Sequence, residues 1–379
     1  MKLAFVSTIL SYPWGGADAL WTRAAERALA QGHQILIAVS PSVASHPRIS
    51  ALRAAGARIH LRTGFTHHRG RRERWRHRLG RALRSRGSLT GVLDAFAPDV
   101  LFLCQGGVWD FLVEDGLVQW LEETACPCIP VCQSNDDRDV VAPESQAPAR
   151  AFFERARATV FVSTHNRDLA GRQCGAPVPR AIVVPNPVEL PASQPPAWPI
   201  ETAPRLAVVA RLEADPKGLD ILLQALARLG PGGDWRVDIF GSGPDETTLR
   251  AEAASLGVEN RIEFAGYSRN IHSLWFTHHL LLLPSRREGC ALALLEALAC
   301  GRPVLTTESG GARDWIEPGV NGYLCSPGSP EALADTLRTA LDEFHRWPRY
   351  GAAARRIFIE RHPSEPERQL LALAQNSQC

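Results

Sequence analysis

The sequence predicts an α/β protein built from two doubly wound, Rossmann-like domains that face each other across a cleft. Short apolar runs alternate with amphipathic stretches, as in parallel sheets covered by helices on both faces. A proline-rich segment interrupts this alternation, which then restarts, and 379 residues suffice for two to three domains. The expected organisation is a first domain over 1–187, a linker over 188–203, a second domain over 204–348 and a helical tail over 349–379. A return of this tail to the first domain is one option.

The first half of the chain is expected to begin with a buried strand. Lys2 and the apolar stretch Leu3–Leu10 resemble a weak secretion signal, but Ser7 and Thr8 lie within that stretch and Tyr12–Gly16 is a turn sequence. The elements expected in this half are strands at Lys2–Thr8, Gln34–Val39, Arg58–Leu61, Val100–Cys104, Cys128–Gln133, Thr159–Ser163 and Ile182–Val184, and helices at Asp18–Gln31 and Pro47–Ala55.

The second half repeats the same alternation after a break. The proline density of Asn186–Pro199 excludes both a helix and a central strand, which favours an interdomain linker. The elements expected beyond it are strands at Arg205–Ala210, Trp235–Phe240, Arg261–Phe264, Leu280–Leu283 and Val304–Thr306, and helices at Leu219–Leu229, Asp245–Leu256, Ala291–Cys300 and Pro330–Phe344.

The charge distribution argues against a nucleic-acid-binding protein. The 42 basic and 40 acidic residues leave a formal net charge of +2, and residues 67–86 alone contribute +8, so the rest of the chain sums to −6. A nucleic-acid binder would be basic over a much larger surface. A hydrophobic content of 45% and a charged content of 22% are typical of a globular protein, and no run approaches the roughly 18–20 apolar residues of a membrane helix.

The cysteines indicate neither a disulfide framework nor a metal site. Nine cysteines, an odd number without regular spacing, favour reduced thiols and a cytoplasmic location. Cys126, Cys128 and Cys132 are close in sequence, but no fourth ligand stands at a useful spacing, so no metal is expected.

The strongest candidate site in the second half contains two glutamates with seven residues between them. Glu288 lies on a turn after an apolar strand, and Glu296 lies about two turns into the following helix. The backbone N–H groups from Gly289 to Leu292 would point out of this helix N-terminus, which suits an anion. An ionised carboxylate only accepts hydrogen bonds, so it suits sugar hydroxyls. The plain alternative is that Glu296 is a polar interruption on an exposed helix face.

Two cations lie where a fold of this class binds its ligand. Arg211 ends the first strand of the second half, and Lys217 follows in the loop before a helix. The carboxyl ends of parallel strands form the usual ligand site of open α/β sheets. A diphosphate there would meet two positive charges, each contributing several kcal/mol, or about 4 kcal/mol at 4 Å for an effective dielectric constant near 20. The alternative is a strand-end arginine and a surface lysine without a ligand.

A set of short motifs in the second half has the order of one known family. These motifs are Arg211-Leu, Lys217-Gly-Leu-Asp, Phe240-Gly-Ser-Gly-Pro, Phe264-Ala-Gly-Tyr, Ser285 with Glu288-Gly, Leu295-Glu-Ala-Leu-Ala-Cys-Gly-Arg-Pro303, Gly310-Gly-Ala and Gly319-Val-Asn-Gly322. In this order they resemble the retaining, nucleotide-sugar-dependent glycosyltransferases of family 4 (group 1), which have the GT-B fold. The resemblance extends weakly to Gly15-Gly16-Ala-Asp18 and Val184-Pro-Asn186-Pro-Val in the first half.

The resemblance implies a role for each of these positions. Arg211 and Lys217 would hold the donor diphosphate and stabilise the charge that develops on the leaving nucleotide. Glu288 would bind the transferred sugar, and Glu296 would bind the ribose hydroxyls. Glycine at position 16 would let the backbone of the first domain approach the phosphate, since a side chain would prevent it. The donor-binding positions besides Glu296 are Gly16, Tyr267 beside the nucleobase, and Gly289, Cys290, Ala291 and Leu292 with their backbone amides.

The resemblance also implies how the reaction proceeds. The first domain would bind the acceptor, a saccharide, a lipid-linked compound or a small molecule, and the second would bind the nucleotide-diphospho-sugar. The acceptor would attack on the face that the leaving group vacates, without a protein nucleophile. No cofactor and no metal are implied, because arginine and lysine take the part of Mg²⁺.

The sequence departs from the family at two places. Cys290-Ala291 replaces the aromatic–glycine pair that often follows the first glutamate. Many members carry a histidine after the strand that corresponds to Cys128–Gln133, whereas this chain has Gln133-Ser-Asn-Asp-Asp137. Gln133, Asn135 or Asp136 could replace that histidine in hydrogen-bonding the sugar or the acceptor.

The arginine-rich strip 69–86 is a second feature of the first half. Trp75, Leu79, Ala82 and Leu83 recur at helical spacing among its arginines, so they form one apolar stripe on a cationic helix. Such a helix suits an anionic membrane surface or a polyanionic acceptor. The alternative is a solvated basic face whose apolar stripe packs on the domain core.

Two other functions remain open from the sequence. An NAD-type oxidoreductase is suggested by Gly241-Ser-Gly243 after a strand, but Glu246 stands where the third glycine of that fingerprint belongs. A non-catalytic protein that binds nucleotide sugars or a partner protein is suggested by the departure at 133–137. The donor's base and sugar are not predicted.

Overall fold

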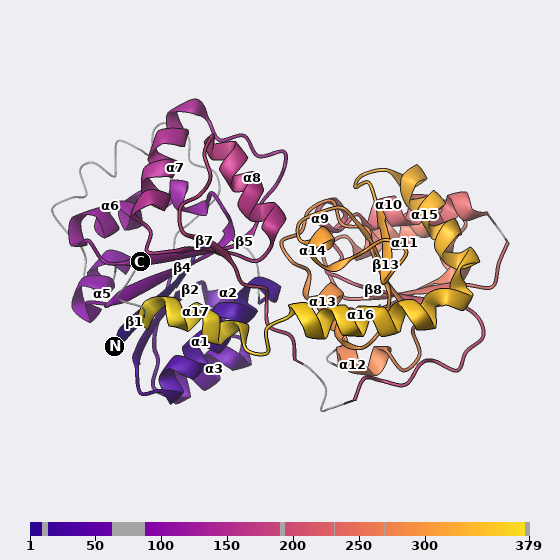
Figure 1. Ribbon diagram of the computed structural model, residues 1–379, viewed down its shortest axis with the longest axis horizontal. Helices are drawn as coiled ribbons and strands as arrows, with labels where there is room; N and C mark the ends of the chain where they lie inside the picture. The colour runs from indigo at the N-terminus through magenta and orange to yellow at the C-terminus, as the bar shows by residue number, and fades with distance from the viewer. Residues whose placement is uncertain (10–13, 63–87, 190–193, 231, 269, 376–379) are drawn as a thin grey trace. The chain divides into compact units, whose positions relative to one another are not determined.

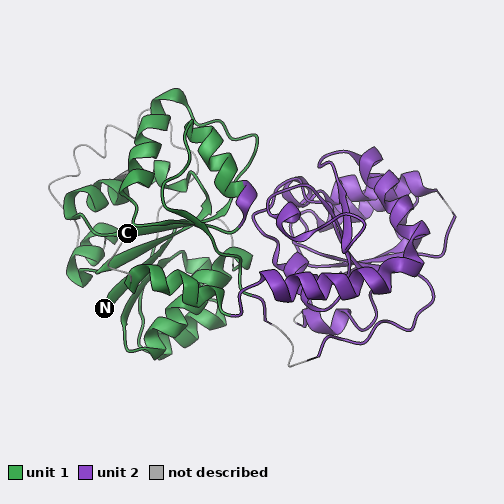
Figure 2. Ribbon diagram, in the orientation of Figure 1, with its two compact units in different colours: residues 1–162, 166–187, 365–379 green, residues 163–165, 188–364 purple. Residues whose placement is uncertain are grey.

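The computed structural model describes residues 1–9, 14–62, 88–189, 194–230, 232–268 and 270–375 (Figure 1). Its chain divides into two compact units (Figure 2). Unit 1 contains residues 1–162, 166–187 and 365–379, and unit 2 contains 163–165 and 188–364. Each unit has one parallel sheet with helices on both faces, so the predicted doubly wound α/β class is confirmed for both.

Unit 1 has a seven-stranded parallel sheet with the strand order β3-β2-β1-β4-β5-β6-β7. Its strands are β1 (Lys2–Ser7), β2 (Gln34–Val39), β3 (Arg58–Leu61), β4 (Val100–Gly107), β5 (Cys128–Ser134), β6 (Thr159–Phe161) and β7 (Ala181–Val183). Its helices are η1 (Gly16–Asp18), α1 (Ala19–Ala30), α2 (Pro41–Ala44), α3 (Pro47–Ala54), α5 (Leu89–Phe96), η3 (Asp110–Val113), α6 (Asp115–Thr124), α7 (Pro143–Arg155), α8 (Thr164–Cys174) and α17 (Pro366–Gln375).

Alternate residues of each central strand of unit 1 belong to opposite hydrophobic cores. Leu3 and Phe5 of β1 pack in one core, where Phe5 stacks on Phe102 with 4.7 Å between ring centroids. Ala4 and Val6 pack in the other core. Because successive side chains of a strand point to opposite faces, a strand buried on both faces appears in sequence as an unbroken apolar run.

Unit 2 has a six-stranded parallel sheet with the strand order β10-β9-β8-β11-β12-β13. Its strands are β8 (Arg205–Val209), β9 (Arg236–Phe240), β10 (Ile262–Gly266), β11 (Leu280–Leu283), β12 (Val304–Thr307) and β13 (Gly322–Cys325). Its helices are α9 (Ala214–Lys217), α10 (Leu219–Leu229), α11 (Glu246–Ser255), η4 (Glu259–Arg261), α12 (Ile271–Leu274), α13 (Leu292–Ala299), α14 (Ala312–Trp315), α15 (Pro330–Asp342), η5 (Phe344–Arg346) and α16 (Trp347–Arg361).

The proline-rich segment belongs by its contacts to unit 2. Residues 194–200 form neither helix nor strand, which the prolines predict. The buried Arg302 donates to the carbonyl oxygen of Ala197 at 2.7 Å, and its guanidinium lies 5.1 Å from the ring centroid of Trp198. This part of the expected linker is therefore docked on unit 2.

The C-terminal tail is divided between the two units. Helix α16 belongs to unit 2, whereas 365–379 belongs to unit 1. Leu370 and Leu371 of α17 are buried in the same core as Trp21 of α1, and Arg27 of α1 pairs with Glu365. The chain thus returns to unit 1 after completing unit 2.

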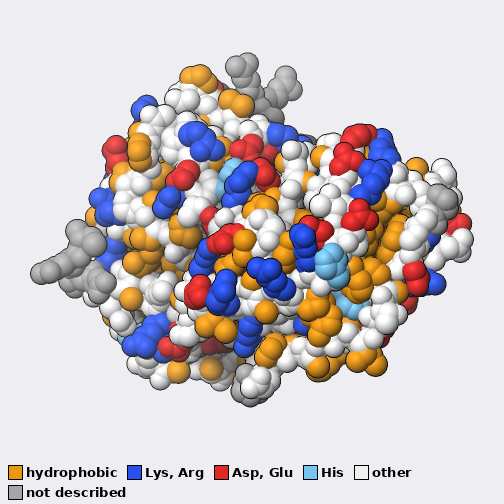
Figure 3. Space-filling model, turned by 45° about the vertical axis from the view of Figure 1, so that its right-hand side comes forward, with side chains coloured by type: hydrophobic (Ala, Val, Ile, Leu, Met, Phe, Trp, Pro, Cys, Tyr) orange, Lys and Arg blue, Asp and Glu red, His pale blue; other side chains and the backbone are white. Residues whose placement is uncertain are grey.

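The surface carries both signs of charge. On the face shown in Figure 3, basic and acidic side chains are interspersed. None of the helices in the described part of the chain has both the length and the apolar composition needed to cross a bilayer. The arginine-rich strip 69–86, including the stripe from Trp75 to Leu83, lies outside the described residues.

Candidate functional site

The candidate site of unit 2 lies at the point where the strand order of its sheet reverses. Strand β8 pairs with β9 on one side and with β11 on the other, so the loops after β8 and β11 leave the same edge in opposite directions. Ligands of open α/β sheets bind at such a point. Arg211 lies on the loop after β8, and Glu288 lies on the loop after β11. Lys217, which was expected in a loop, is the last residue of the short helix α9 that follows Arg211.

Lys217 and Glu288 are brought into direct contact. The Nζ of Lys217 lies 2.7 Å from the Oε1 of Glu288, and the Oγ of Ser285 donates to the same oxygen at 2.8 Å. The side chains of Lys217 and Glu288 are 24% and 14% exposed, so the pair is partly shielded from solvent. Charge-assisted hydrogen bonds of this kind are shorter and stronger than neutral ones. Ser285 belongs to the same sequence motif as Glu288, but its hydrogen bond to Glu288 was not predicted.

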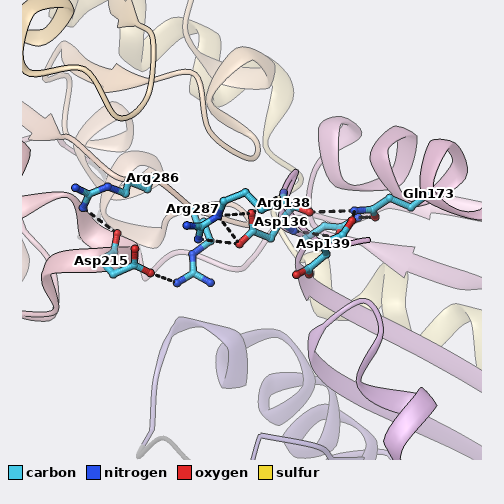
Figure 4. Close-up of polar contacts among 8 residues, drawn as sticks. Asp136, Arg138, Asp139, Gln173, Asp215, Arg286 and Arg287 are labelled. Carbon is cyan, nitrogen blue, oxygen red and sulfur yellow. Dashed lines mark hydrogen bonds and ion pairs between the residues drawn. The ribbon is translucent and has the colours of Figure 1, made fainter. Parts of the chain in front are cut away.

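Arg286, on the same loop as Glu288, forms hydrogen bonds with residues of α9 and α10. Its guanidinium donates to both carboxylate oxygens of Asp220, at 2.7 and 2.6 Å, and to the carbonyl oxygen of Ala214 at 2.9 Å. Burial of the Asp220 carboxyl opposes ionisation, but hydrogen bonds and charge from Arg286 hold its pKa below the ordinary value. The neighbouring Arg287 pairs with Asp215 (Figure 4). The sequence motifs did not predict these contacts, because Arg286 and Asp220 are 66 positions apart in the sequence.

Gly218 allows the close approach of the segments that follow β8 and β11. It has a φ of +63°, and a Cβ at this position would collide with the carbonyl oxygen of Pro284 at the end of β11. A glycine is therefore needed here both for the left-handed conformation and for the contact.

Arg211 has a carboxylate partner within its own loop. Its Nη2 lies 2.8 Å from the Oε1 of Glu213, and the two side chains are 37% and 17% exposed. The sequence predicted the position of Arg211 at the strand end, but Glu213 was not recognised as its partner.

The predicted anion-binding turn leads into α13. Ala291 is the N-cap and its carbonyl oxygen accepts from the N–H groups of Leu294 and Leu295, while Leu292 is the first helical residue. The first N–H groups of a helix have no intrahelical acceptor and can bind an anion. Gly289 and Cys290 are buried, and burial raises the pKa of the Cys290 thiol well above its ordinary value, so this thiol stays protonated.

The other two donor-side residues differ in exposure. Tyr267, directly after β10, is 74% exposed. Glu296 is half-buried in α13, and burial, together with the negative charge of Glu189, raises its pKa to about 7. A carboxyl that titrates near neutral pH is typical of a functional site, although structural groups do so as well.

The titration of Glu296 predicts a pH-dependent stability. Its pKa is about 7 in the folded protein against an ordinary 4.5, so its contribution is complete below about pH 4.5 and is lost as the pH rises through about 7. Relative to Glu296→Gln, the wild type should gain melting temperature as the pH falls from about 8 to about 5. Glu360→Gln, on the exposed face of α16, is the matched control. Its melting temperature should differ from that of the wild type by the same amount at both pH values. A constant difference between wild type and Glu296→Gln would contradict the raised pKa.

Gln133, Asn135 and Asp136 lie together at the end of β5 in unit 1. The Oε1 of Gln133 accepts from Asn186 at 3.0 Å, whereas its buried Nε2 has no hydrogen-bond partner among the described residues. Asn135 donates to Gln173 at 2.8 Å. Asp136 pairs with Arg138, and Gln173 donates to the backbone carbonyl of Asp136 (Figure 4). Gln173 and Asn186, which come from other segments, were not predicted to belong to this cluster.

Gly16 is the first residue of η1 in unit 1. The turn that contains it is closed by Asp18, whose carboxylate accepts from the Gly15 N–H and from the Trp21 Nε1, each at 3.1 Å. Burial raises the pKa of Asp18 to about 6, against the effect of these two hydrogen bonds. The expected approach of Gly16 to a phosphate stays a prediction.

The glycines that suggested an NAD site have a packing role. A Cβ at Gly241 would collide with the carbonyl oxygen of Ala210, and one at Gly243 would collide with that of Leu212. These glycines let the loop after β9 lie against the loop that carries Arg211. Packing therefore accounts for their presence without a dinucleotide. The described residues also include no cluster of three or more His, Cys, Asp or Glu side chains that could hold a metal.

The sequence of unit 2 matches a known family. Residues 193–356 match the model described as "Glycosyl transferases group 1". N-acetyl-alpha-D-glucosaminyl L-malate synthase of Bacillus anthracis is 34% identical over 151 residues, which are 39% of this chain and 39% of that protein. The match thus spans well under half of this curated relative.

The fold of the whole chain matches solved glycosyltransferases. Anabaena HepE in complex with UDP has a TM-score of 0.75 at 20% identity, with 100% of both chains covered, and its complex with UDP-glucose has a TM-score of 0.74. The lipopolysaccharide outer core galactosyltransferase WaaB has a TM-score of 0.70 at 17% identity, covering 98% of this chain and 99% of that one. The chain therefore has the GT-B fold of these proteins, and its residues 193–356 match the model of group 1 glycosyltransferases.

Proposed function

We propose that this protein is a glycosyltransferase that moves a sugar from a nucleotide-diphospho-sugar to a saccharide, lipid-linked or small-molecule acceptor. The observation that carries the proposal is the contact between Lys217 and Glu288 at the strand-order reversal of unit 2. This contact lies within the segment that matches the group 1 family, and Anabaena HepE, which has the same fold, was solved in complex with UDP and with UDP-glucose.

In this proposal the positive charges of unit 2 hold the donor diphosphate. Arg211 and Lys217 attract the two phosphates and stabilise the negative charge that grows on the leaving nucleotide. Glu288 accepts hydrogen bonds from the transferred sugar, while the amides from Gly289 to Leu292 bind the sugar and the phosphate. Glu296 in its ionised form accepts from the ribose hydroxyls, and Tyr267 lies beside the nucleobase.

The chemistry then consists of positioning and charge stabilisation. The acceptor attacks on the face that the nucleotide leaves, so the configuration at the sugar carbon is retained and no protein nucleophile or metal is used. Among the three candidates at the end of β5, we assign the hydrogen bond to the sugar or acceptor to Gln133. Its buried Nε2 can donate to a ligand, whereas Asn135 and Asp136 already pair with Gln173 and Arg138.

Nucleotide binding tests the proposal most directly. A ligand that binds only the folded state raises the melting temperature, so a panel of UDP-, GDP-, ADP- and TDP-sugars should contain at least one donor that stabilises the protein. The same donor should be hydrolysed slowly by the wild type and not by Glu288→Ala. Stabilisation by a donor that the protein neither hydrolyses nor transfers would favour the non-catalytic alternative. A panel without any shift would contradict the proposed function.

The strip 69–86 leads to a separate proposal, peripheral contact with an anionic membrane. Flotation with anionic vesicles tests it, using charge reversal at Arg71, Arg72 and Arg76. Binding that survives the charge reversal would contradict it.

A further inference from the structure

Both cations of the candidate donor site already face a carboxylate. Lys217 contacts Glu288 at 2.7 Å, and Arg211 contacts Glu213 at 2.8 Å. Glu288 belongs to the proposed sugar site, but Glu213 has no role in the reaction as described above. A second carboxylate at a site for a diphosphate needs a physical explanation, because like charges repel.

Glu213 is held in place by the backbone on both sides. Its N–H donates to the carbonyl oxygen of Arg211 at 2.9 Å, and its own carbonyl oxygen accepts from the N–H of Lys217 at 3.2 Å. The next residue, Ala214, donates its N–H to the carboxylate of Asp245 at 2.8 Å. The Glu213 backbone is therefore fixed at the N-cap of α9, between Arg211 and Lys217, and from there its carboxylate reaches Arg211.

We propose that Glu213 is a positioning residue with a second effect: it competes with the donor diphosphate for Arg211. When the site is empty, the carboxylate orients the guanidinium and neutralises it. When a nucleoside diphosphate is bound, the carboxylate and the diphosphate both interact with the Arg211 guanidinium, and the carboxylate repels the phosphates. Binding of the product nucleotide is weakened as a result, and its release is faster. This inference rests on the proposed function, since it assigns Arg211 to the diphosphate.

Replacing Glu213 with glutamine separates the two effects. The amide oxygen of glutamine still accepts a hydrogen bond from Arg211, but the negative charge is gone. Loss of one fixed charge beside a partly exposed diphosphate site should lower Kd by about tenfold. Glu213→Ala removes the charge and the orienting contact together, so its gain in affinity should be smaller than that of Glu213→Gln.

The experiment measures equilibrium binding to the full chain by calorimetry, using UDP, GDP, ADP and TDP and, separately, inorganic pyrophosphate. Glu213→Gln should bind the preferred nucleoside diphosphate and pyrophosphate about tenfold more tightly than wild type, and the gain should shrink at high salt. The product should also inhibit this variant more strongly. Glu246→Gln is the matched control, because Glu246 pairs with the exposed Arg250 on α11, and its affinities should equal those of wild type.

The outcomes distinguish this inference from the proposed function. If no nucleoside diphosphate binds to the wild type, the proposed function fails, and pyrophosphate still measures competition at Arg211. If nucleotides bind but Glu213→Gln binds them and pyrophosphate no more tightly than wild type, the competition is disproved. Weaker binding by Glu213→Gln than by wild type would likewise overturn it, and would leave Glu213 with an orienting role alone.

Discussion

Replacing Lys217 with methionine is expected to lower kcat/KM for the proposed sugar transfer by about two to three orders of magnitude. The substitution keeps most of the side-chain length and removes the charge that would stabilise the leaving diphosphate, and the loss of one such group commonly costs about 10²–10³-fold. Lys217→Arg should lose less activity, because it keeps the positive charge and changes only the geometry of the cationic group. Steady-state kinetics with the preferred donor measure both variants.

A double substitution separates this catalytic role from a structural ion pair. Lys217→Met alone leaves the partly buried Glu288 without its cation, so stability should fall. Adding Glu288→Gln removes that unpaired charge and should restore much of the melting temperature, whereas activity should stay low. If the double variant regains activity with stability, Lys217 and Glu288 form only a structural pair.

Replacing Gly310 with alanine is expected to remove donor binding almost completely. Gly310 follows β12 with a φ of +53°, and a Cβ there would collide with the carbonyl oxygens of Glu288 and Gly289. The neighbouring Gly311 donates its N–H to Gly289 at 2.7 Å, so this loop supports the turn before α13 directly. The turn must move to accept the methyl group, which should displace Glu288 from Lys217. Binding of the preferred nucleotide and urea unfolding are the measurements.

Gly319 provides the control for backbone strain. It has a φ of +76°, but a Cβ there would meet open space. Gly319→Ala should cost about 1–2 kcal/mol from the left-handed conformation alone and should keep donor binding. Any further decrease in the free energy of unfolding of Gly310→Ala then measures the cost of the collision. Equal donor affinity in the two variants would show that the turn before α13 is not needed for the donor.

Several strands were predicted correctly at both ends. Gln34–Val39 and Leu280–Leu283 are mostly buried apolar runs, so local composition identifies them. Arg58–Leu61 also agrees with the structure at both ends, although it is partly exposed and alternates polar with apolar residues. Strand β13 was missed because Gly322–Cys325 is short and begins with glycine. Helix α7 was missed because Pro143–Arg155 contains Pro148 in its interior, which local propensity disfavours.

The candidate site was predicted as separate parts. Arg211, Lys217 and Glu288 follow from their positions after apolar strands and from the order of the family's motifs. That Lys217 contacts Glu288 did not follow, because the two residues are 71 positions apart in the sequence. The raised pKa of Glu296 was not predicted either, since it depends on burial and on Glu189.

Local sequence was enough to predict the fold class, the two repeats of strand and helix, and the residues that follow the strands of the site. These properties depend on local preference and on apolar periodicity, which act over a few residues. Which charged side chains form ion pairs depends on the three-dimensional arrangement of the strands. Strands β8 and β11 became neighbours through the crossover connections of the sheet, and this contact placed Lys217 against Glu288. Charge pairing between distant loops depends on strand order, which local sequence does not encode.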